Sequence, residues 1–166
     1  MVGLLTRRPG DVMSRALELR IPPVAVTLLS VLVMWAISGY SRPLGVPLPA
    51  RASAALLLVV LGLGIIVAGG KSFRTMRTTV NPMTPDAASA LVVSGVYRYT
   101  RNPMYLGMLL ILLGWAAFLT SVFAVIVLPV FVAYLTRFQI IPEESALALA
   151  FGDDYAAYRA AVRRWV

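Results

Sequence analysis

Two short polar segments, far apart in the chain, contain the residue types that could bind a ligand or take part in chemistry. The first reads Arg101-Asn102-Pro103-Met104-Tyr105-Leu106-Gly107. Asn102 is a favourable N-cap and Pro103 suits the first helical position, so we expect a helix to begin there. The first turn of that helix presents unpaired backbone N–H groups and the positive end of its dipole beside Arg101. This arrangement would attract a carboxylate or a phosphate.

Helical spacing predicts that Asn102 and Tyr105 share one face of this helix. Gly107 lacks a side chain, which could let a flat ligand approach the backbone. The spacing leaves a purely structural interpretation open, in which Asn102 caps, Tyr105 anchors the helix at a membrane interface and Gly107 packs.

An aromatic and basic segment precedes the helix. If it is extended, its side chains alternate, and three of them fall on one side: Tyr97, Tyr99 and Arg101.

The second polar segment, Pro142-Glu143-Glu144, adjoins the end of a long apolar run. Carboxylates at a membrane boundary are costly unless they are solvated or paired. We therefore expect either that both glutamates are solvated among lipid headgroups or that one meets a cation. That cation could be an arginine of the first segment or a cationic ligand.

Two short helices are expected after the glutamates. Pro142 can open the first, Gly152 can end it and Asp153 can cap the next. An apolar stripe at helical spacing follows in the last helix: Tyr155, Tyr158, Val162 and Trp165. Such a helix would lie on a membrane surface or pack over a helix bundle.

Long apolar runs must position these segments. The chain is 60% hydrophobic and 13% charged, whereas soluble domains have about 45–50% apolar and about 25% charged residues. A spanning helix needs about 20 mostly apolar residues, and four runs qualify: 21–40, 52–70, 103–119 and 121–141. The predicted fold class is an all-α integral membrane bundle of about four transmembrane helices. The last two form a tight hairpin, and short cytoplasmic helices follow at the C-terminus.

The basic residues give this bundle an orientation. All 15 lysines and arginines except Arg42 and Arg51 fall on one side of the predicted path. The positive-inside rule then predicts cytoplasmic N- and C-termini in a bacterial-type inner membrane, with the first apolar run kept as an anchor. The net charge of +8 is explained in this way. Nucleic acid is not an expected partner, because no basic patch with interleaved aromatics is present.

Two residue types are missing from the sequence. With no cysteine and no histidine, disulfides, thiolate chemistry and imidazole catalysis are excluded, and we expect no metal site. Acid–base chemistry would fall to the seven acidic residues, the tyrosines or the substrate itself.

The order and separation of the two polar segments resemble the isoprenylcysteine carboxyl methyltransferase and phospholipid methyltransferase-like superfamily of membrane methyltransferases. The matching features begin with Tyr97-Arg98-Tyr99 and the segment from Arg101 to Gly107. They continue with Glu143-Glu144, Phe151-Gly152, Tyr155, Tyr158 and a terminal Arg163-Arg164-Trp165. The resemblance covers about residues 73–166. We therefore expect one domain over residues 1–166, with two spans in 1–70 and the family core in 71–166.

The resemblance implies methyl transfer from S-adenosylmethionine to a lipophilic acceptor embedded in the bilayer. It implies that the cofactor site is lined by Tyr97, Asn102, Tyr105, Gly107, Glu143, Glu144, Tyr155 and Tyr158. Arg101 and Glu144 would take the catalytic roles, with Arg101 facing an anionic group. Where the family usually has histidine this chain has Asn102, which cannot take up a proton near neutral pH.

The acceptor and the activity class are left open by the residues. An isoprenylcysteine-type carboxylate, a lipid amine or another lipophilic acid would each fit. A non-catalytic membrane scaffold with a degenerate pocket is the main alternative, and a nicotinamide-dependent membrane reductase is a more distant one. The sequence predicts no particular oligomeric state.

Overall fold

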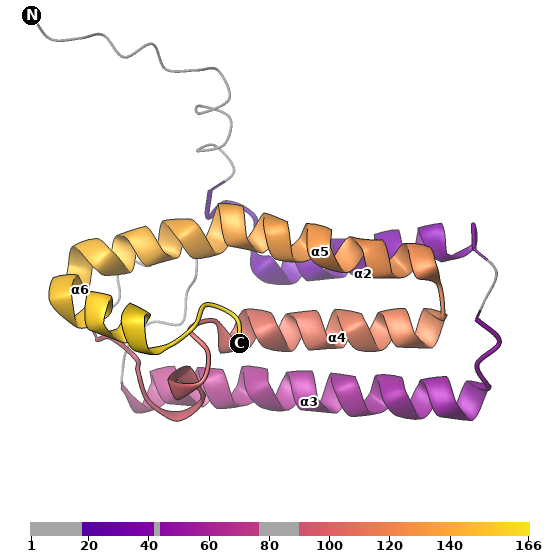
Figure 1. Ribbon diagram of the computed structural model, residues 1–166, viewed down its shortest axis with the longest axis horizontal. Helices are drawn as coiled ribbons and strands as arrows, with labels where there is room; N and C mark the ends of the chain where they lie inside the picture. The colour runs from indigo at the N-terminus through magenta and orange to yellow at the C-terminus, as the bar shows by residue number, and fades with distance from the viewer. Residues whose placement is uncertain (1–17, 42–43, 77–89) are drawn as a thin grey trace, which may run out of the picture.

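The computed structural model describes residues 18–41, 44–76 and 90–166, and all regular structure in these ranges is helical, with no strand. The helices are α2 (Pro23–Ser38), α3 (Leu48–Thr75), α4 (Pro103–Leu119), α5 (Val122–Leu135) and α6 (Ile141–Ala161). A 3-10 turn, η2 (Gly95–Arg98), precedes α4, and a π-helical segment, η3 (Thr136–Ile140), joins α5 to α6. In Figure 1 the long helices run side by side, with α4 between α3 and α5.

Two of these helices are long and apolar enough to cross a membrane: Leu48–Thr75, and the continuous helix Val122–Ala161. The helices α2 and α4 are apolar but shorter, with 16 and 17 residues. At 40 residues, Val122–Ala161 is about 60 Å long, twice the roughly 30 Å of bilayer hydrocarbon. Only its apolar part, α5, therefore suits the hydrocarbon, because η3 carries Arg137 and Gln139 and α6 carries four carboxylates.

The predicted hairpin is confirmed, because α4 ends at Leu119 and α5 begins at Val122. Thr120 adopts the left-handed conformation, with φ 50°, and Ser121 Oγ accepts a hydrogen bond from the Ala124 N–H at 3.4 Å. The first two runs differ from prediction, since α2 is shorter than 21–40 and α3 is longer than 52–70. The helix α3 continues through Lys71 to Thr75, where the basic side chain of Arg74 in its last turn favours the helix dipole.

Glycines bring α3 and α4 into close contact. A Cβ on Gly107 would lie 2.6 Å from the Gly62 carbonyl oxygen, and a Cβ on Gly62 would lie 2.5 Å from that of Gly107. Small residues at such crossings let membrane helices approach closely. This packing holds the start of α4 against the C-terminal half of α3.

A bend at Gly152 turns the chain back onto the bundle. Gly152 has φ 49° and ψ −120°, so the regular helix is interrupted there, as the sequence predicts. The C-terminal residues then run beside the start of α4 (Figure 1). The predicted apolar stripe is wrong beyond Tyr158, because the helix ends at Ala161 and Val162 is extended.

Candidate functional site

The C-terminal segment pairs with the residues that start α4. The Arg101 N–H donates to the Arg163 carbonyl at 3.0 Å. The Arg164 carbonyl accepts from Asn102 Nδ2 at 2.9 Å and from Thr100 Oγ1 at 3.3 Å. We call residues 162–166 the C-terminal strap. It joins the two polar segments that the sequence singled out.

Glu144 is the centre of the charged cluster under this strap. Arg164 donates to it twice, from Nε to Oε1 at 3.0 Å and from Nη2 to Oε2 at 2.7 Å. Arg101 Nη2 lies 3.2 Å from Glu144 Oε1. The expectation that one glutamate meets an arginine of the first segment is therefore confirmed for Glu144. The pairing of Arg164 with Glu144 was not predicted, because the last helix was expected to continue to Trp165 and in fact ends at Ala161.

Two nitrogen atoms of the Arg101 guanidinium donate no hydrogen bond to any described residue. Its side chain is only 10% exposed, and its Nε and Nη1 atoms are buried with no hydrogen-bond partner in the part of the chain that the structure describes. An unpaired buried donor is costly, and more so on a charged group. These two nitrogens could therefore bind an anionic group of a ligand.

Glu143 has a different environment from its neighbour. The Tyr105 hydroxyl donates a hydrogen bond to Glu143 Oε1, and none of the ion pairs among the described residues involves Glu143. Burial holds the pKa of Glu143 above its ordinary value; the bond from Tyr105 opposes this shift and the charge of Glu144 adds to it. Glu143 can thus take up a proton more readily than a solvated glutamate.

Three tyrosines enclose the cluster. Tyr97 and Tyr155 are buried, and the Tyr158 hydroxyl donates to the Tyr97 carbonyl at 2.8 Å. Burial raises the pKa of Tyr97, Tyr155 and Tyr158, so all three hydroxyls stay protonated at neutral pH. The charges of Glu144 and Arg101 also act on the pKa of Tyr155, which places that ring beside the ion pairs.

The prediction of an extended segment with Tyr97, Tyr99 and Arg101 on one side is wrong. The chain forms the 3-10 turn η2 instead, with Tyr97 buried and Tyr99 78% exposed. The turn begins at Gly95, whose φ is 63° and whose Cβ position would be 2.8 Å from Ser72 Oγ. Close packing on α3 therefore decides the local conformation.

Asn102 and Gly107 have structural contacts in place of the expected open surface. Asn102 occupies the N-cap position before Pro103, as predicted, but its side chain makes no capping bond and binds the strap. The space beside Gly107 is filled by Gly62 and Ile66 of α3, so a ligand cannot approach the backbone there. The structure thus brings together the expected residues other than Gly107, and Arg164 joins them. That these residues bind a cofactor stays a prediction.

Comparison with known proteins gives two matches. A family model described as phospholipid methyltransferase matches residues 50–154. An uncharacterized protein of Haemophilus influenzae (strain ATCC 51907 / DSM 11121 / KW20 / Rd) is 43% identical over 63 residues, which cover 38% of this chain and 100% of that protein. No solved structure matches the chain significantly. The matched family region includes both polar segments and ends before Tyr155 and the strap.

Proposed function

Because the chain belongs to the phospholipid methyltransferase family, we propose that it transfers a methyl group from S-adenosylmethionine to a lipophilic acceptor in the membrane. The observation that carries this proposal is the charged cluster of Arg101, Glu144 and Arg164 at the end of an apolar helix bundle. A polar cofactor and a lipid-soluble acceptor can meet only where polar groups adjoin a lipid-facing surface. The cluster and the apolar helices satisfy both requirements.

The residues of the cluster suit the polar end of this cofactor, which carries an α-carboxylate and an α-ammonium. The unpaired Nε and Nη1 of Arg101 can bind the carboxylate. Glu144, or Glu143 beside it, can bind the ammonium or the ribose hydroxyls. The bound cofactor supplies an electrophilic methyl group on a sulfonium. The buried Tyr97 and Tyr155 exclude water from the cluster, and Tyr158 fixes Tyr97 through its carbonyl.

Glu143, which accepts a hydrogen bond from Tyr105, is the residue that would accept a proton released by the methyl acceptor. A carboxylate acceptor, such as an isoprenylcysteine, needs no deprotonation. An amine acceptor must lose a proton, and Glu143 can accept it at the atom that the Tyr105 hydroxyl approaches. Asn102 cannot do so, because an amide has no such basicity.

The membrane arrangement belongs to the same proposal. We propose four crossings, by α2, α3, α4 and α5, with both termini in the cytoplasm of a bacterial-type inner membrane. The distribution of basic residues in the sequence supports this orientation. Residues 1–166 would act as one domain, since the helices of 1–70 pack on those of 71–166.

A non-catalytic scaffold is the second candidate, and one observation favours it. Both oxygens of Glu144 are already bound by arginines of the same chain. A pocket that has lost its ligand could be closed by contacts of this kind.

Calorimetric titration of S-adenosylmethionine into the full chain in detergent separates the two candidates, with NADPH as the control ligand. We expect saturable binding to one site, weakened at least tenfold by Arg101→Ala and by Glu144→Ala, since each removes a charge-assisted hydrogen bond. Arg74→Ala, at an exposed position on α3, is the matched control. Absence of binding in both detergent and lipid nanodiscs would favour the scaffold. Unchanged affinity in both cluster variants would refute the site.

A further inference from the structure

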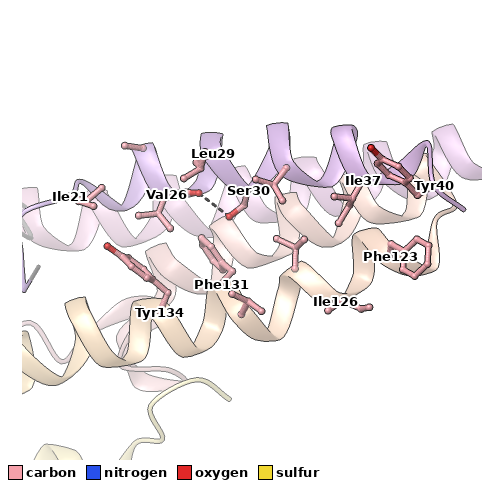
Figure 2. Close-up of a pocket in the computed structure, with 14 residues that line it drawn as sticks. Ile21, Val26, Leu29, Ser30, Ile37, Tyr40, Phe123, Ile126, Phe131 and Tyr134 are labelled. Atoms are coloured by element: carbon pink, nitrogen blue, oxygen red, sulfur yellow. Dashed lines mark hydrogen bonds between the residues drawn. The ribbon is translucent and has the colours of Figure 1, made fainter. Parts of the chain in front are cut away.

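A groove runs along the outer surface of the bundle between α2 and α5. It has a volume of about 730 Å³ and is lined almost entirely by apolar side chains. Figure 2 shows Ile21 and Tyr134 near one end and Tyr40 and Phe123 near the other. The Ile21 end is the one that adjoins η3 and therefore faces the cytoplasm in the orientation proposed above. A groove of this kind is open to the hydrocarbon of the bilayer.

One hydroxyl in the groove has no partner. The Tyr134 hydroxyl is buried and makes no hydrogen bond within the described residues. The Ser30 hydroxyl, by contrast, donates to the Val26 carbonyl at 2.8 Å (Figure 2). In an apolar medium a hydroxyl without a partner is costly. The position of Tyr134 therefore indicates a ligand that brings a hydrogen-bond acceptor into an otherwise apolar groove.

Residues 18–21 close the cytoplasmic end of the groove. The Leu19 N–H donates to the Phe138 carbonyl at 3.1 Å, and Gln139 Nε2 donates to the Ile21 carbonyl at 2.7 Å. Beside this crossing, Arg137 Nη1 pairs with Glu18 Oε1 at 2.9 Å, and the Arg137 side chain is 45% exposed. The crossing lies along the helix between the groove and Glu143, so the groove is separate from the charged cluster.

We propose that the groove binds one membrane glycerophospholipid that is not the methyl acceptor. An acyl chain lies between α2 and α5, an ester carbonyl accepts the hydrogen bond of Tyr134, and the phosphate lies against Arg137. Apolar side chains and the Tyr134 hydroxyl line the groove, and the Arg137 guanidinium lies one helical turn beyond Tyr134, outside the groove. This order matches the acyl chain, ester and phosphate of such a lipid.

The length of the groove suits the acyl chain of a lipid. The helix from Phe123 to Tyr134 spans about 17 Å, close to half of the roughly 30 Å hydrocarbon thickness. Tyr134 and Arg137 are then about 4.5 Å apart along the axis, which suits an ester and its neighbouring phosphate.

The test is native mass spectrometry of the full chain in detergent with added palmitoyl-oleoyl phosphatidylglycerol. We expect one retained lipid, with affinity reduced about five- to tenfold by Tyr134→Phe, which keeps the ring and removes only the hydroxyl. Arg137→Gln should weaken retention by a similar factor. Tyr40→Phe is the matched control, because Tyr40 lines the outer end of the same groove and is 83% exposed.

Three outcomes would overturn the proposal. The first is that Tyr134→Phe and Tyr40→Phe both leave lipid retention unchanged. The second is that a branched hydrocarbon without a headgroup is retained as tightly as the phospholipid. The third is that the chain forms a dimer and releases the lipid. Binding of S-adenosylmethionine, measured on the same variants, should stay at the wild-type value. This readout separates a failure of the lipid site from a failure of the proposed methyl transfer.

Discussion

The charged cluster predicts an unequal response to the loss of Glu144, its centre, and of Arg164, one of the two arginines bound to it. In Glu144→Gln, Arg101 and Arg164 both face a neutral amide. In Arg164→Gln, Glu144 still keeps Arg101 at 3.2 Å. Arg101 is 10% exposed and Arg164 is 37% exposed, so water can replace a lost partner at Arg164 but not at Arg101. Removing the carboxylate should therefore destabilise the protein more than removing Arg164.

The magnitudes follow from burial. Breaking a buried pair by removing one partner costs about 3–5 kcal/mol, and we expect about 3 kcal/mol for Glu144→Gln because the amide oxygen still accepts a hydrogen bond. The two bonds from Arg164 would be worth about 1.5–3 kcal/mol each if they were buried, but exposed ion pairs contribute only about 0.2–1 kcal/mol. For Arg164→Gln we therefore expect about 1–2 kcal/mol.

A double-mutant cycle measures both values and their coupling. The assay is reversible unfolding in mixed micelles of the wild type, Glu144→Gln, Arg164→Gln and the double variant. Hydrogen exchange at the Arg101 N–H, which donates to the Arg163 carbonyl at 3.0 Å, reports whether the strap has detached. Equal costs for the two single variants, or a coupling below about 0.5 kcal/mol, would refute this account of the cluster.

Two further predictions concern packing and titration. Gly107→Ala should lower the free energy of unfolding by about 1–3 kcal/mol, because the new Cβ would lie 2.6 Å from the Gly62 carbonyl oxygen. Gly64→Ala, with nothing within 4 Å of its Cβ position, is the control in thermal unfolding, and equal losses would contradict the packing. The pKa of Glu143 is raised in the folded state, so its contribution favours folding below the ordinary pKa of a glutamate and is lost as pH rises through the raised value. Unfolding midpoints measured against pH should fall less steeply in Glu143→Gln than in the wild type, and parallel curves would show that Glu143 does not titrate in this way.

Features that depend on neighbouring residues in the chain were predictable. The apolar runs predicted the four long apolar helices, the break at Thr120-Ser121 predicted the hairpin, and Pro103 predicted the start of α4. Gly152 predicted an interruption of the helix that carries the glutamates. Each of these rests on local chemistry: apolar length, a missing proline N–H or a backbone conformation that glycine adopts without strain.

Features that depend on contacts across the fold were not predictable. The residue types indicated that a glutamate would pair with an arginine. They did not indicate that Glu144 would pair with two arginines while Glu143 accepts a hydrogen bond from Tyr105. That division depends on the direction the chain takes after Gly152, which sets where Arg164 meets α6. The turn at Gly95 likewise follows from its contact with Ser72. The polar segments and their spacing could be identified from the chain because polarity and spacing are local. Their partners depend on the fold, because a hydrogen bond needs both atoms within about 3 Å.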